Sequence, residues 1–159
     1  MWYVLHVKPR MEKKVYAELR LLNVFCYLPL YRMVTKVQRR KVVRELPLFP
    51  GYVFTRLSPD ARREILKTQR IVRTIEVAEP RKMIHELRQI RHAGRLPVDL
   101  KAISTFEVGE RVRMSSGPFC GLEGYVQRKG SATSLVLTLE ILGRAVEVSV
   151  SPVDLERAT

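Results

Sequence analysis

Long apolar runs are missing from this sequence of 159 residues. None approaches the roughly 20 consecutive apolar residues that a membrane-spanning helix needs, and the first residues lack the basic-then-apolar pattern of a signal peptide. We therefore expect a cytoplasmic protein with no membrane partner. Hydrophobic residues still make up 46% of the chain, which is enough for one medium domain or two small ones and argues against global disorder.

The residues that build metal, redox and catalytic sites are also few. The two cysteines, Cys26 and Cys120, lie far apart, and we interpret them as buried or incidental thiols. The histidines His6, His85 and His92 do not have the spacing of metal ligands, and no glycine-rich phosphate loop precedes a helix. A thiol site formed by Cys26 and His6 is a minor alternative. We expect no metal, no cofactor and no catalytic residues, and therefore a binding protein rather than an enzyme.

Acidic residues are scarce in one part of the chain only. Residues 1–94 contain 21 Lys and Arg against 8 Asp and Glu, whereas residues 106–159 contain 6 against 7. A basic domain attracts polyanions because its binding releases their condensed counterions. Residues 1–94 are therefore the candidate nucleic-acid-binding part, and we expect the nearly neutral remainder to contact protein.

The first 94 residues predict an α+β domain in which helices pack on an antiparallel sheet. Ser58-Pro59-Asp60 has the residues of a helix start, namely a capping serine, a proline suited to the first turn and an acid at the positive end of the helix dipole. Arg39-Arg40-Lys41 is expected at the tip of a hairpin. Strands are expected at residues 2–7, 24–38, 42–48, 52–57 and 71–77, and helices at 10–22, 58–69 and 80–94.

A second domain is expected after a linker. Residues 95–105 have mixed charge and no clear period, so we interpret them as the linker. From residue 106 onward, short strands alternate with turns rich in Gly, Ser and Pro, which is typical of a small β-barrel. The expected organisation is a domain at 1–94, a linker at 95–105 and a barrel at 106–159.

Two segments hold aromatic residues in unusual surroundings. In Leu46–Phe54, Pro47 and Pro50 bracket Phe49, which would hold that ring at low entropic cost. The ring is either part of the core or an anchor for a partner, since aromatic residues dominate binding hot spots. In Gly109–Gly124, turn chemistry explains the glycines but does not explain a phenylalanine, Phe119, in an exposed turn.

Together these motifs resemble the NusG family of transcription factors, in the family's order and over nearly the whole chain. Some members of the family have two aromatic residues in the segment that corresponds to Pro47-Leu48-Phe49-Pro50-Gly51. This chain has one, which makes the segment more similar to that of specialised RfaH-like antiterminators. The N-terminal NGN domain is matched by Trp2-Tyr3-Val4 and Leu48-Phe49-Pro50-Gly51-Tyr52-Val53. The C-terminal KOW domain, a small SH3-like barrel, is matched by Gly109-Glu110-Arg111-Val112-Arg113, Gly117-Pro118-Phe119, Gly121–Gly124, Leu142-Gly143-Arg144-Ala145 and Val153–Glu156.

The resemblance implies a monomeric regulator of transcription elongation that binds RNA polymerase. In the family, the N-terminal domain docks on the clamp helices and favours processive elongation or antitermination. The positions that match the docking residues are Trp2, Phe49, Pro50 and Tyr52. The family also contacts DNA at the upstream fork, often the non-template strand. Candidates for that contact are Lys8, Lys13, Lys14, Arg20 and the tip Arg39, Arg40 and Lys41, although an ordinary solvated helix face also explains Lys13, Lys14 and Arg20.

The KOW domain of the family recruits a partner, either the termination factor Rho or the ribosomal protein NusE. The candidate contact residues here are Phe119, Leu142 and Arg144. Leu142 stands where the family usually has phenylalanine, so the apolar area is kept and the aromatic edge is lost. The alternative is a ribosome-associated, RNA-binding KOW protein. Against it, a ribosomal KOW domain should carry the positive charge itself.

Overall fold

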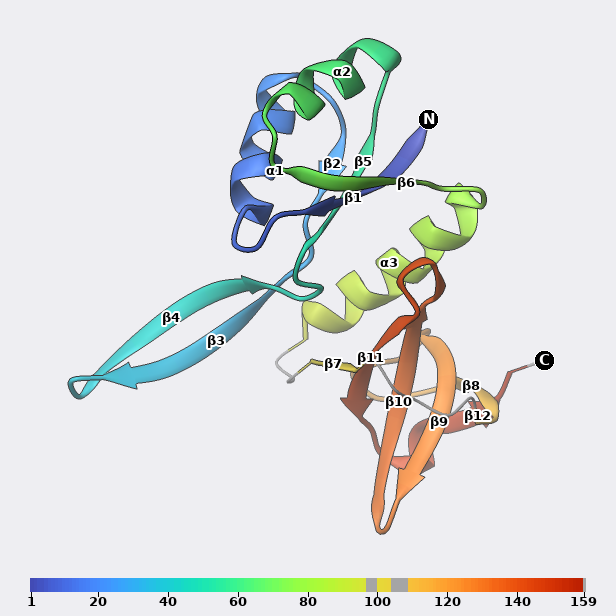
Figure 1. Cartoon of the computed structure of the whole chain (residues 1–159). Coiled ribbons are helices and arrows are strands. Elements are labelled where there is room, and N and C mark those ends of the chain that lie inside the picture. Colours follow the sequence, from blue (N-terminus) through green and yellow to red (C-terminus); the bar gives the residue numbers. More distant parts are fainter. Residues whose placement is uncertain (97–99, 104–108, 159) are drawn as a thin grey trace. The chain divides into compact units, whose positions relative to one another are not determined.

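The computed structural model describes residues 1–96, 100–103 and 109–158. The chain divides into two compact units, Met1–Pro80 and Arg81–Thr159, and each is described by itself (Figure 1). The predicted α+β architecture is confirmed, since three α-helices accompany sheets whose described strand pairs are all antiparallel.

The first unit is built on a four-stranded antiparallel sheet with the order β2-β5-β1-β6. Its strands are β1 (Trp2–Val7), β2 (Cys26–Tyr27), β5 (Tyr52–Arg56) and β6 (Ile71–Glu76). The inner strand β1 pairs with β5 on one side and with β6 on the other. Because side chains alternate between the two faces of a strand, β1 divides its residues into two sets with different surroundings.

Two helices cover one face of this sheet, α1 (Glu12–Leu21) and α2 (Pro59–Lys67) (Figure 1). Val15 and Leu19 of α1 and Ile65 of α2 pack in one core cluster with Leu5 and Val53 of the sheet. The predicted start of α2 is confirmed, because the Ser58 hydroxyl accepts a hydrogen bond from the Ala61 amide at 3.2 Å. Asn23, just after α1, has a left-handed φ of 55°, which suits a residue that ends a helix.

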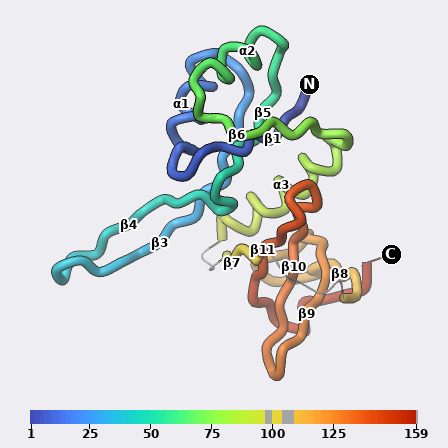
Figure 2. The backbone as a smooth tube through the Cα atoms, viewed as in Figure 1, coloured from blue at the N-terminus to red at the C-terminus, as the bar shows by residue number. Residues whose placement is uncertain are grey.

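A long hairpin extends from the first unit (Figure 2). It consists of β3 (Leu30–Val37) and β4 (Arg40–Pro47), which pair only with each other among the described strands. Both turn residues, Gln38 and Arg39, have positive φ angles. Positive φ at both turn residues is the requirement of a type I′ turn, whose twist matches that of the two strands. The predicted hairpin is therefore confirmed, but its turn is one residue earlier than expected, so that Arg40 and Lys41 of the expected tip begin β4.

The second unit contains the helix α3 (Pro80–Gly94) and a six-stranded sheet of order β12-β8-β9-β10-β11-β7. The strands are β7 (Lys101–Ile103), β8 (Arg111–Met114), β9 (Glu123–Lys129), β10 (Ala132–Leu139), β11 (Arg144–Ser149) and β12 (Leu155–Arg157), with 3-10 turns η1 (Glu140–Leu142) and η2 (Pro152–Asp154). At Gly124 a β-carbon would lie 2.5 Å from the Val136 carbonyl oxygen, so the close approach of β9 and β10 requires glycine.

The expected linker is partly a strand. Lys101–Ile103 forms β7, which pairs with β11 at the edge of the barrel sheet, so these residues are not an irregular connection. Their pairing with β11 stabilises the strand, because the sequence alone favours a strand only at Ile103. Residues 97–99 and 104–105 of the expected linker, and the expected barrel start at 106, lie outside the described residues. Among the residues that the structure describes, no helix is long and apolar enough to cross a membrane.

The boundary of the N-terminal domain is testable with fragments. The composition change after Gly94 predicts that residues 1–94 fold on their own, whereas the compact units divide at Pro80. We expect a 1–94 fragment to melt cooperatively, and a 1–80 fragment to be less stable or unfolded. Circular dichroism melting of both fragments measures this. Equal stability of the two fragments would contradict the proposed domain at 1–94 and place its boundary near Pro80.

Candidate binding surfaces

The face of the sheet opposite α1 and α2 carries most of its aromatic residues. On β1 the register places Trp2 opposite Arg56, Val4 opposite Phe54 and His6 opposite Tyr52. Residues paired in this way point to the same face. The pairing of Tyr27 with Phe54 adds a third strand to this face. We call these residues the aromatic face, which comprises Trp2, Val4, His6, Tyr27, Tyr52 and Phe54.

Only the margin of the aromatic face is accessible. Val4 and Phe54 at its centre are fully buried, whereas Trp2, His6 and Tyr52 are half-buried. The rings of His6 and Tyr52 stack with centroids 5.1 Å apart and an angle of 21° between their planes. The sequence-predicted residues Trp2 and Tyr52 therefore share one face. His6, which the sequence offered only as a thiol partner, lies between them on β1.

Phe49 does not lie at the surface as an anchor would. Its side chain is only 1% exposed and is among the largest fully buried side chains. The two prolines around it fix the backbone, but they hold the ring inward rather than outward. Of the two interpretations of Phe49, core residue or anchor, its burial supports the core residue, and we expect Phe49 to contribute mainly to stability.

Pro50 borders an open hollow of about 710 Å³ at the base of the hairpin, with a mainly apolar lining. The Glu12 carboxylate, itself buried, accepts a hydrogen bond of 2.9 Å from the Gly51 amide and thereby fixes the turn at the edge of the hollow. Gly51 has a φ of +90°, which a residue with a side chain rarely adopts. The lining also includes His6 and Lys13. Two predicted sites are thus neighbours, since Pro50 was assigned to polymerase and Lys13 to nucleic acid.

The predicted nucleic-acid contacts are all exposed cations. Within the described part of the chain, none of these cations forms an ion pair. Lys8 is held by its amide, which donates to the Arg70 carbonyl at 2.9 Å, and the Arg70 side chain pairs with Glu18 of α1. One cation directly follows β1, three lie on α1 and three lie at the hairpin tip; in this order they are Lys8, then Lys13, Lys14 and Arg20, then Arg39, Arg40 and Lys41.

The alternative thiol site is not formed. Cys26 packs in the core beneath α1, whereas His6 lies on the opposite, aromatic face of the sheet. Burial raises the pKa of the Cys26 thiol, and the nearby charge of Arg20 opposes this only in part. A protonated, buried thiol is a weak nucleophile, so Cys26 is a core residue.

In the barrel, Phe119 is also more buried than expected. It lies in the turn between β8 and β9, but its side chain is only 5% exposed, so the ring belongs to the barrel core. The expected exposed turn residue is therefore wrong. Leu142 and Arg144 are half-buried, on either side of Gly143, which has a left-handed φ of 60°. They are the accessible members of the predicted partner-binding set.

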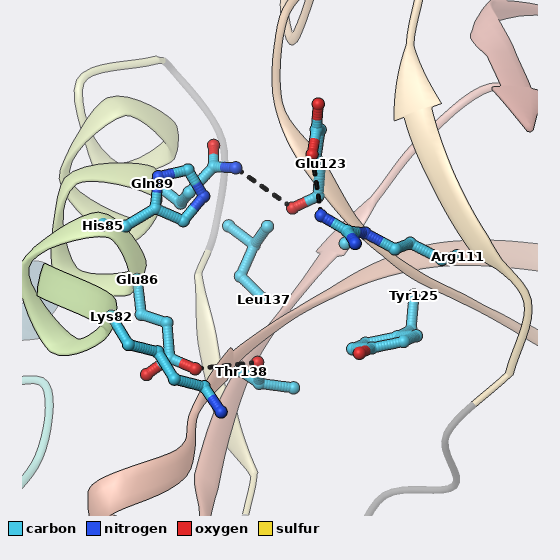
Figure 3. Close-up of a pocket in the computed structure, with 10 residues that line it drawn as sticks. Lys82, His85, Glu86, Gln89, Arg111, Glu123, Tyr125, Leu137 and Thr138 are labelled. Carbon is cyan, nitrogen blue, oxygen red and sulfur yellow. Dashed lines mark hydrogen bonds and ion pairs between the residues drawn. The ribbon is translucent and has the colours of Figure 1, made fainter. Parts of the chain in front are cut away.

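Helix α3 contacts the barrel through polar side chains (Figure 3). The Glu86 carboxylate accepts hydrogen bonds from the Glu140 amide at 3.1 Å and from the Thr138 hydroxyl at 3.4 Å. The Gln89 side-chain amide donates to the Glu123 carbonyl at 3.3 Å, and Lys82 forms an ion pair with Glu140. These side chains border a polar hollow of about 350 Å³. Desolvation by burial raises the pKa of Glu86, while the Glu140 amide and the charge of Lys82 oppose the increase.

The chain is similar in sequence to known proteins. The family model described as "Transcription termination factor nusG" matches residues 1–91. The chain is 28% identical to the "Transcription termination/antitermination protein NusG" of Borreliella burgdorferi, and the match covers 94% of each protein. The chain is therefore a member of the NusG family of transcription termination and antitermination factors.

Two solved structures are also similar. One is described as "Domain interaction in Thermotoga maritima NusG", with 21% identity, a TM-score of 0.48, and coverage of 99% of this chain and 97% of the other. The second is a conformation of the MjSpt4:Spt5 complex, with 16% identity, a TM-score of 0.32, and coverage of 100% and 97%. Family membership rests on the family model, which includes most of α3.

The raised pKa of Glu86 predicts a pH dependence of stability. A carboxyl group whose pKa is raised in the folded state stabilises that state below its ordinary pKa of 4.5, and this contribution is lost as the pH rises through the folded-state value. We expect Glu86→Gln to flatten the decrease in stability above pH 4.5, with an effect below about 1 kcal/mol because the group is partly solvated. Calorimetry of both proteins from pH 4 to pH 7 measures this. An unchanged pH profile would contradict the assignment.

Proposed function

We propose that this protein regulates transcription elongation by binding the clamp helices of RNA polymerase through its N-terminal domain. The observation that supports this most is the aromatic face, where Trp2, His6 and Tyr52 lie half-buried at the margin of a rigid antiparallel sheet. Aromatic side chains on a rigid scaffold bind with little loss of conformational entropy. Pro50 and its apolar hollow extend this docking surface. In this proposal the effect on polymerase is increased processivity and antitermination.

The proposed contact with DNA is made by the cations of α1 and of the hairpin tip. Residues 1–94 carry 21 Lys and Arg against 8 Asp and Glu, and the seven candidate cations are exposed. This charge favours a polyanion, which in the proposal is DNA at the upstream fork or the non-template strand. No catalytic step is included, since the proposal needs binding alone.

The barrel is proposed to recruit a protein partner. Residues 106–159 contain 6 Lys and Arg against 7 Asp and Glu, so nonspecific attraction to RNA is weak. Leu142 and Arg144 are accessible beside the Gly143 turn. The proposed partner is NusE or Rho, and copurification of ribosomal RNA in place of polymerase would favour the ribosome-associated alternative.

Polymerase docking is tested with Tyr52→Ala. Because Tyr52 is half-buried, we expect near-normal melting together with a loss of about 2 kcal/mol or more in the free energy of polymerase binding. Tyr125→Ala, which removes a half-buried tyrosine on β9 of the barrel, is the matched control and should bind normally. Phe49→Ala should instead lose about 3–5 kcal/mol of folding stability. Melting and polymerase affinity are measured on the same samples. Normal polymerase binding by folded Tyr52→Ala would exclude this docking surface.

Nucleic-acid binding is tested by removing the charge of the hairpin tip. A triple variant with Arg39, Arg40 and Lys41 changed to Gln should bind DNA more weakly. Its slope of log affinity against log salt should decrease in magnitude by about 2 to 3, because three phosphate contacts are lost. The matched control removes three exposed cations of the barrel, Arg113, Arg128 and Lys129, and should change little. Fluorescence anisotropy over a salt series measures both. Equal losses in the two variants would show that net charge alone, and not the tip, binds DNA.

A further inference from the structure

Phe25 is an exposed aromatic residue that the proposed docking residues do not include. Its side chain is 60% exposed, although it precedes the short strand β2 in a well-packed sheet. Ordering a flexible segment on binding has an entropic cost. At Phe25 the backbone is already fixed, because its carbonyl accepts bonds from the Thr55 hydroxyl at 2.8 Å and from the Arg56 amide at 3.0 Å.

The register aligns Phe25 with the aromatic face. Cys26 pairs with Thr55 and Tyr27 with Phe54, so Phe25 stands level with Arg56. Arg56 in turn pairs with Trp2 on β1. The rings of Phe25 and Trp2 are in contact, with centroids 5.4 Å apart and planes at 71°, an edge-to-face pair. Phe25, Arg56 and Trp2 therefore form one row across three strands, at the end of the aromatic face farthest from Tyr52.

The surroundings of this row favour protein over nucleic acid. The Phe25 ring packs edge-to-face against Trp2, and the row includes the exposed side chain of Arg56. A platform for nucleobases needs open aromatic faces, whereas aromatic side chains packed together beside an arginine are typical of protein-binding hot spots. Arg56 within the row is exposed and supplies a positive charge. Charge complementarity thus favours a partner surface that is apolar with acidic residues at its edge.

We propose that Phe25 is a binding residue that extends the polymerase-docking surface beyond Trp2, and that it contacts an apolar, acid-edged helix surface of the polymerase. This inference rests on the proposed function, since it assigns Phe25 to the same partner as Tyr52. Phe25 makes little contribution to the core, because most of its side chain is in solvent. Its removal should therefore weaken binding without unfolding the protein.

The test measures the binding of core RNA polymerase, without nucleic acid, to the full chain and three variants. Phe25→Ala should melt like the parent and bind about ten-fold or more weakly, as expected for an aromatic hot spot. Val34→Ala is the matched control, because it removes a side chain that is also 60% exposed, on the hairpin. It should bind like the parent. Tyr52→Ala reports on the proposed docking surface independently of Phe25.

The outcomes separate this inference from the proposed function. Weakened binding by Phe25→Ala and Tyr52→Ala, with normal binding by Val34→Ala, supports the inference. If only Tyr52→Ala binds weakly, the inference is overturned and the docking surface stands. If Tyr52→Ala binds polymerase as tightly as the parent, or if the parent itself does not bind polymerase, the proposed docking surface is excluded, and the inference about Phe25 is excluded with it. A Phe25→Ala variant that loses affinity for a single-stranded DNA oligonucleotide but not for polymerase would identify a base-stacking residue and overturn the inference.

Discussion

The position of β1 between two antiparallel neighbours is the constraint on which the first unit depends. Alternate residues of this strand are divided between two faces. One set, including Leu5 and Val7, packs beneath α1 and α2, whereas the set that includes Trp2 and His6 lies on the aromatic face. A shift of one residue in this register would exchange the two sets and destroy both the core and the proposed docking surface.

The second constraint is the uneven distribution of charge between the basic hairpin and the nearly neutral barrel. The hairpin β3–β4 is a two-stranded ribbon with six basic residues against one acid in residues 30–47. An isolated two-stranded ribbon is only marginally stable in water, and the DNA contact proposed for the tip would give these exposed cations a role. The barrel has almost no net charge. It is stabilised by its closely packed strands and by hydrogen bonds with α3.

The sequence predicted the elements better than the exposure of single residues. Ser58, Asn23 and the hairpin turn carry local signals, because capping and left-handed backbone depend on nearby atoms. The flanking Pro residues left Phe49 either in the core or at the surface, and Phe119 was expected in an exposed turn, yet both are buried. Their burial depends on distant packing, which local turn chemistry does not encode. The prominence of Phe25 and the pairing of β7 were missed for the same reason, since cross-strand register determines both.

The account's central claim is that the aromatic face is the surface that contacts polymerase. Site-specific photo-crosslinking tests it most directly, with a photoreactive phenylalanine placed at Tyr52 and, in a second protein, at the exposed Arg63 of α2 on the opposite side of the sheet. The account predicts a crosslink to the polymerase clamp helices from position 52 and none from position 63. Crosslinks from position 63 alone would contradict it and place polymerase on the helical face.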